Sequence, residues 1–196
     1  MRRSRTLVGA VLVLALTAVG CGSTGSGSIV TETREVEAFD RIEVSSGIAV
    51  EITVDPAAPA GVISIYDDNL QDKIITEVDG DTLVIQVRGN VIAPGSGRMV
   101  KVEMPVLIGL FADGGATVDG TGTADHLELR AEGGAVVDFE DMTVQTMNVG
   151  LDGGSTATVK PLDEVTGQVT GGATLTLTNS PAFRDVDVSG GGKVSG

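Results

Sequence analysis

Apolar and polar residues alternate with a period of two along most of this chain, which is typical of half-buried strands. In the N-terminal half, five segments alternate in this way and are predicted strands: 41–44, 48–54, 62–66, 82–87 and 99–104. Asp79-Gly80-Asp81 and Ser46-Gly47 are turn signals between them. Only residues 68–74 suggest a short helical turn.

A Gly-Gly pair recurs through the C-terminal half. Its first glycine falls at five positions: 114, 133, 153, 171 and 190. The steps between them are 18 to 20 residues long, and a fixed period of this length indicates stacked structural repeats.

The positions within each repeat form columns of similar residues. The residue after the glycine pair is small: Ala116, Ala135, Ser155, Ala173 and Gly192. Two positions further on the column is apolar: Val118, Val137, Ala157, Leu175 and Val194. Before the pair, two apolar columns enclose a mostly polar one: Phe111, Arg130, Gly150, Gln168 and Asp187. We expect the small column inside a sharp corner, glycines in the left-handed region at the corner, and the last column facing solvent.

Strands joined by such corners, with like positions stacked about 4.8 Å apart, predict an all-β parallel β-helix with coils of about 19 residues. The high glycine content, 28 of 196 residues, and the low aromatic content, 3%, agree with many short strands around a thin aliphatic core. No linker divides the chain after residue 28. The prediction is a single domain over 29–196, with the Gly-Gly repeats at 107–196.

The first 28 residues have a different character. Arg2, Arg3 and Arg5 precede an apolar run at 6–19, which suits a signal peptide and is short for a membrane-spanning helix of about 20 residues. The run ends in Ala18-Val19-Gly20-Cys21, which resembles the lipobox of bacterial lipoproteins. Residues 1–20 are therefore a predicted lipoprotein signal peptide, and Cys21 is the predicted lipid attachment site. Residues 21–28 contain this cysteine and a predicted flexible tether rich in glycine and serine.

The formal charge of -14 excludes nucleic acid as a plausible partner, because like charges repel the phosphate backbone. For the same reason, membrane attachment is expected through the lipid on Cys21. The single cysteine leaves no intramolecular disulfide, so stability must come from backbone ladders and apolar stacking.

Candidate chemistry is sparse. His126 is the only histidine, too few for a zinc site, and is interpreted as a surface residue at a turn. Asp119 and Asp138 share one outward column, and a second acidic column contains Asp113, Glu132 and Asp152. Stacked carboxylates of this kind could bind Ca²⁺ or serve as the acid and base of a glycosidase, and they are also what a solvated acidic surface would show. No catalytic residue, metal site or cofactor is predicted.

Four segments occur in the order found in a known family: 39–52, 67–70, 75–85 and 102–107, followed by the Gly-Gly repeats. With Asp67-Asp-Asn-Leu70 among them, the chain resembles the head GIN domain family of auto-transporter adhesins over about residues 38–195. The resemblance implies a right-handed β-helix on an exported, often lipid-anchored protein. The family has no established catalytic residues to transfer.

These observations together predict a non-catalytic lipoprotein of the cell envelope, held outside the cytoplasm by its lipid. It would serve as an adhesin-like binding or structural scaffold, with a surface glycan or an envelope protein as its partner. The alternative is a glycan-acting enzyme or a calcium-dependent binder that uses the stacked carboxylates.

Overall fold

The computed structural model describes residues 22–93 and 96–196. The predicted signal peptide and Cys21 lie outside the described residues. Within these ranges the protein is all-β, with one 3₁₀ turn, η1 (Gln71–Lys73). No helix of the described part is long and apolar enough to span a membrane.

Sixteen strands form in the described chain. Their bounds are β1 (Ser23–Thr24), β2 (Ile29–Arg34), β3 (Arg41–Val44), β4 (Ala49–Val54), β5 (Gly61–Asp67), β6 (Ile74–Asp79), β7 (Thr82–Val87), β8 (Val91–Ile92), β9 (Met99–Met104), β10 (Gly109–Ala112), β11 (Thr117–Ala131), β12 (Val136–Leu151), β13 (Thr156–Val169), β14 (Thr174–Leu177), β15 (Phe183–Val188) and β16 (Lys193–Ser195). Fourteen of them belong to one sheet, and β1 pairs only with β8.

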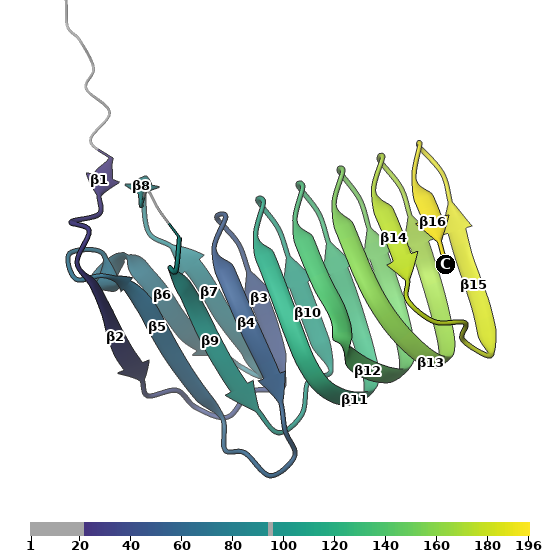
Figure 1. Ribbon diagram of the computed structural model, residues 1–196, viewed down its shortest axis with the longest axis horizontal. Helices are drawn as coiled ribbons and strands as arrows, with labels where there is room; N and C mark the ends of the chain where they lie inside the picture. Colours follow the sequence, from purple (N-terminus) through teal and green to yellow (C-terminus); the bar gives the residue numbers. More distant parts are fainter. Residues whose placement is uncertain (1–21, 94–95) are drawn as a thin grey trace, which may run out of the picture.

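The large sheet bends back on itself. The first part of β11, from Thr117 to Gly122, pairs with β4, whereas its last part, from Glu128 to Ala131, pairs with β10. β12 and β13 run alongside β11 over the same bend (Figure 1). The sheet therefore has two arms that face each other across the core, and it nearly closes around that core like a flattened barrel.

Tight turns of two glycines join the arms at the side opposite the bend. In the five pairs the first glycine has φ of 58–65° and the second 77–89°. The residue after each pair donates its N–H to the carbonyl of the residue before it, at 2.9–3.2 Å. Two consecutive positive φ angles define a type I′ turn, which residues with a Cβ reach only at a cost. Ser46-Gly47 makes a sixth turn, with φ of 66° and 69°.

The register confirms the predicted columns. Thr117, Val136 and Thr156 pair across β11, β12 and β13, and β14 and β16 continue the series at Thr174 and Lys193. The small residues behind the turns are fully buried: Ala116, Ala135, Ser155 and Ala173. These columns and the buried aliphatic residues of β3, β4, β5, β6, β7 and β9 form one continuous core.

The prediction of a right-handed parallel β-helix with 19-residue coils over the whole domain is wrong. Three strand pairs are antiparallel: β2–β5, β5–β9 and β6–β7. The sheet is thus mixed, because Gly80 (φ 66°) and Asp81 form a two-residue hairpin loop that reverses the chain between β6 and β7. Parallel stacking with one turn per repeat is confined to the Gly-Gly segments and the strands next to them.

A polar plug closes the N-terminal end of the core. The side chain of Gln71 donates to the carbonyl of Val30 at 3.1 Å and accepts from the hydroxyl of Ser64 at 2.7 Å. Arg34 adds a hydrogen bond to the Gln71 carbonyl at 2.8 Å, and Leu70 beside it is fully buried. The plug covers this end of the sheet with hydrogen-bonded polar groups, although the buried Nε atom of Arg34 has no hydrogen-bond partner.

Residues 22–28, expected to be a flexible tether, lie against the domain in the structure. β1 pairs with β8, and the N–H of Gly27 donates to the Asp67 carboxylate at 2.6 Å. Asp67 is buried and forms an ion pair with Arg98. A Cβ on Gly25 would lie 2.6 Å from the Asp67 carboxylate, so glycine permits the close approach.

Substitution of Gly153 by valine should destabilise the fold by roughly 1–3 kcal/mol, since its φ is 65° and a Cβ would meet the Gly133 nitrogen at 3.0 Å. Thr174→Val, on an outward position of β14, should be nearly neutral. Urea unfolding of both variants measures the difference. Equal effects would contradict the turn assignment.

The pKa of Asp67 is lowered from its ordinary value of 3.8 to about 2, mainly because Arg98 donates a hydrogen bond to the carboxylate. Burial of the carboxylate opposes this lowering, and the hydrogen bond from the Gly27 N–H adds to it. The carboxylate therefore stabilises the fold above its ordinary pKa, and this contribution is lost as the pH falls from about 3.8 to about 2. Asp67→Asn should lower the melting temperature at pH 7, and the gap to wild type should narrow over that window. The exposed Asp163→Asn serves as the control, and a constant gap for Asp67→Asn would contradict the assignment.

Candidate functional site

The predicted acidic columns are present, but they do not converge on a metal. Asp119 lies between Glu51 and Asp138 in one outward column of β4, β11 and β12. Burial and the two neighbouring carboxylates raise the pKa of Asp119, with burial the larger cause. Among the described residues, no group of three or more His, Cys, Asp or Glu side chains is placed to hold a metal ion.

Two aspartates of the second acidic column cap their own turns. Asp152 accepts a hydrogen bond from the N–H of Gly153 at 2.7 Å, and Asp113 does the same for Gly114. A carboxylate next to two glycines of positive φ is thus accounted for by local turn geometry. His126 is exposed, as predicted, but it lies within β11, where its Nδ1 is 3.0 Å from the Thr146 hydroxyl.

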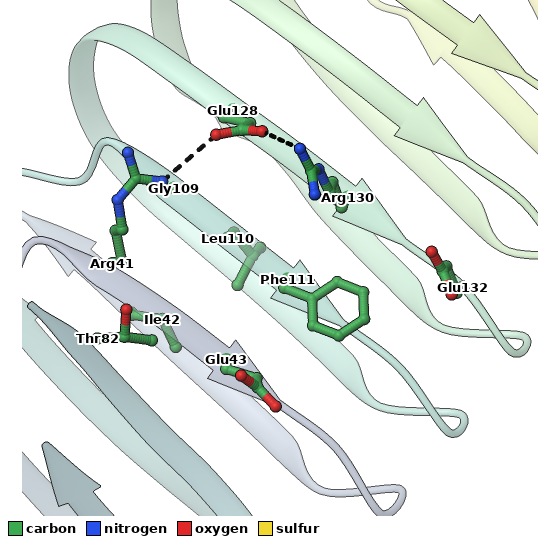
Figure 2. Close-up of a pocket in the computed structure, with 10 residues that line it drawn as sticks. All are labelled: Arg41, Ile42, Glu43, Thr82, Gly109, Leu110, Phe111, Glu128, Arg130 and Glu132. Atoms are coloured by element: carbon green, nitrogen blue, oxygen red, sulfur yellow. Dashed lines mark hydrogen bonds and ion pairs between the residues drawn. The ribbon is translucent and has the colours of Figure 1, made fainter. Parts of the chain in front are cut away.

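A hollow of about 380 Å³ lies on the opposite arm, over β3, β10 and β11. Glu128 is one of its lining residues and pairs with Arg130 at 2.6 Å and with Arg41 at 3.4 Å. Figure 2 shows the two arginines reaching Glu128 from either side, with the ring of Phe111 between Glu43 and Glu132. The hollow therefore combines a partly exposed aromatic ring with fixed planar hydrogen-bonding groups.

Glycine shapes the floor of this hollow. Gly109 occupies an outward position of β10, and Arg41 and Glu128 flank it in register. A Cβ at Gly109 would lie 2.6 Å from the Arg41 Nη1 atom. Without that Cβ, the guanidinium of Arg41 lies flat across β10 and reaches Glu128.

A second hollow of about 680 Å³ continues the first across β12, β13 and β15. The two share Arg130 and Glu132, and the second also contains Gly150 and Gln168. We call the two hollows together the lateral groove. It crosses the strands instead of running along them, and the outward residues of successive repeats form its floor.

The sequence pattern had placed Phe111, Arg130 and Gly150 in one outward column, and the register confirms it. The sequence pattern indicates solvent-exposed surface for that column and predicts no site there. Arg41 and Glu43 lie about 70 residues earlier, outside the recognisable repeats, and only the pairing of β3 with β10 brings them to the groove.

Comparison with known proteins gives a family and a fold. A family model described as "Putative auto-transporter adhesin, head GIN domain" matches residues 38–121 and 108–181. No curated protein matches the chain.

Solved structures of low identity are similar over most of the chain. A "putative adhesin" from Bacteroides fragilis has 15% identity and a TM-score of 0.58, with 89% of this chain and 99% of the other covered. One from Parabacteroides merdae has 14% identity and a TM-score of 0.46, with coverage of 89% and 98%. A "putative lipid binding protein" from Parabacteroides distasonis has 13% identity and a TM-score of 0.43, with coverage of 87% and 98%. The first likeness concerns the fold alone.

Because neighbouring carboxylates repel, Asp119→Asn should stabilise the fold at pH 7 by roughly 0.2–1 kcal/mol, the range for a cross-strand pair. The sign follows from the raised pKa of Asp119, which makes its ionised form unfavourable in the fold.

Millimolar Ca²⁺ should raise the melting temperature no more than Mg²⁺ at equal ionic strength, because general screening acts on both. A large Ca²⁺-specific shift that disappears in Asp119→Asn/Asp138→Asn would contradict this and establish a metal site.

Proposed function

The chain belongs to the family described as "Putative auto-transporter adhesin, head GIN domain", and from this premise we propose that it is a non-catalytic, adhesin-like binding protein of the cell envelope. Its binding surface is the lateral groove. The function is exerted by holding a ligand against the outward side chains of the bent sheet.

The observation that carries the proposal is the fixed charge network in the groove. Glu128 holds Arg41 and Arg130 in place from both sides. A guanidinium whose position is set by a carboxylate presents its remaining N–H groups in a defined direction, so it loses little conformational freedom on binding. Such preorganisation suits recognition of a polar ligand.

Binding is favoured over catalysis by the placement of the carboxylates. A general acid needs a raised pKa close to the substrate. Asp119 has a raised pKa, but it lies on the arm that pairs with β4, away from the groove. In the groove, the Glu128 carboxylate is engaged in ion pairs with two arginines.

The proposal includes the lipid anchor. Cleavage before Cys21 and acylation of its thiol would tie the protein to a membrane outside the cytoplasm. Gly22 to Ser28 would then follow the lipid directly. Since β1 and Gly27 contact the domain near Asp67, the anchor would join the protein at the N-terminal end of the sheet.

Cys21→Ala should abolish incorporation of labelled fatty acid and move the protein from the membrane to the soluble fraction, because a chain with a net charge of -14 is repelled by an anionic surface. Metabolic labelling and fractionation measure both effects. If wild type takes up no lipid and the variant stays in the membrane unprocessed, the anchor is wrongly assigned.

Binding is tested with the mature protein on an array of glycans and extracellular matrix proteins. Arg130→Glu should weaken the interaction at least about tenfold, because it places a second carboxylate beside Glu128. Lys193→Glu, an equal charge change on the exposed strand β16, should leave it unchanged. Absence of any ligand, or equal loss in the two variants, would contradict the proposed function.

A further inference from the structure

Gly150 is a glycine that the fold itself does not require. It lies inside the long strand β12, where glycine normally weakens a sheet. Its φ is not in the left-handed region, and a Cβ there would meet nothing closer than the Cγ atom of Arg130 at 3.7 Å, an ordinary contact. By contrast, a Cβ on Gly167 would lie 1.9 Å from the Val149 carbonyl oxygen, so that glycine is needed for packing.

The absent side chain at Gly150 leaves a depression between groups that can contact a ligand. In register across the sheet, Phe111 precedes Arg130, Arg130 precedes Gly150, and Gly150 precedes Gln168. One outward column therefore presents an aromatic ring, a guanidinium, a depression and a carboxamide in sequence. Beside the depression, Asn148 donates to the Thr166 hydroxyl at 3.1 Å, which fixes another polar pair.

We propose that the lateral groove binds a linear, uncharged oligosaccharide laid across the strands, with one sugar ring on Phe111 and another in the depression at Gly150. This inference rests on the proposed binding function and names the ligand class. Sugar rings stack on aromatic faces through their C–H groups, and their hydroxyls pair with guanidinium, carboxylate and amide groups. The groove offers all of these in one line.

The length of the groove suits a chain of several sugars. From β3 to β15 it crosses five strand spacings of about 4.8 Å, so it extends for roughly 24 Å. Each strand adds one outward side chain to each column. A polymer with a regular repeat can therefore make similar contacts at successive strands.

Other ligand classes fit less well. Glu43, Glu132 and Asp152 border the groove, and the chain carries a charge of -14, so an anionic glycan would be repelled. A peptide in an extended conformation binds best by adding to a free strand edge. From β3 to β13 the groove crosses strands whose backbone groups already pair with neighbours on both sides, and of the strands under the groove only β15, at its end, has a free edge.

The test is calorimetric titration of the mature protein with cellohexaose, chitohexaose and mannohexaose, with hexagalacturonate as the acidic counterpart. At least one neutral hexasaccharide should bind. It should bind more tightly than its own disaccharide, with little dependence on salt, and hexagalacturonate should not bind. Failure of all three neutral sugars would overturn the inference, as would preferential binding of the acidic one.

Gly150→Thr should weaken the sugar at least about tenfold while the melting temperature stays the same or rises, since threonine favours strands. The matched control is Gly61→Thr on β5, where a Cβ would meet nothing within 4 Å. Phe111→Ala should weaken binding similarly, whereas Phe183→Ala, at an exposed ring on β15, should not. Unchanged affinity in Gly150→Thr would overturn the placement.

The two proposals fail in different ways. If an array ligand is a protein whose binding depends on Arg130, and no neutral sugar binds, the adhesin-like function stands and the glycan inference is wrong. If no array component binds at all, the binding function itself is wrong.

Discussion

The two-glycine turn, repeated in register, is the constraint on which the rest of the structure depends. Each turn requires two consecutive residues in the left-handed region, and the turns stack so closely that a Cβ on Gly114 would meet the backbone nitrogen of Ser46 at 3.2 Å. Because the turn has no spare residue, it fixes which side chains of the following strand point inward. A shift of one residue would expose the whole core column.

The outward surface inherits this order. Once the turns fix the register, residues about 20 apart in sequence become neighbours across the sheet, and every outward position becomes a column. The lateral groove arises where two such columns hold glycines, at Gly109 and Gly150. The first lets Arg41 lie across the sheet, and the second leaves a depression that packing does not fill. The regular sheet thus has a hollowed surface at these two glycines, because they carry no side chain.

The two ends of the sheet differ. At the N-terminal end, Gln71 donates to the Val30 carbonyl and Arg34 donates to the Gln71 carbonyl, and these two side chains cover the core. The ion pair of Asp67 with Arg98 holds residues 22–28 against the same end. At the other end β15 and β16 are paired on one side, and Phe183 and Val188 are about half exposed. The proposed lipid attachment at Cys21 would therefore act through the end that is covered and tied down.

The sequence alone determined the turns, the columns and most of the strands, because alternation and the Gly-Gly period are local properties of the chain, but it predicted no strand at Ile29–Arg34. It also showed that residues 1–28 differ in composition from the domain. Four motifs in the order typical of the family indicated the family resemblance. The sequence did not determine how the two halves pair. Asp79-Gly80-Asp81 was recognised as a turn, yet its antiparallel hairpin makes the sheet mixed, and the parallel β-helix prediction fails there. Strand direction is a relation between segments, and no single segment carries it.

The candidate site needed the tertiary structure for the same reason. Phe111, Arg130 and Gly150 were visible as one column, but nothing in the sequence distinguished that column from ordinary solvent-facing surface. Arg41 joins it only because β3 pairs with β10, and Gly150 becomes informative only when the space around it is known to be empty. The repeat is visible in the sequence because each two-glycine turn depends on local backbone preference. The groove is not, because it depends on distances between residues that are far apart in the sequence.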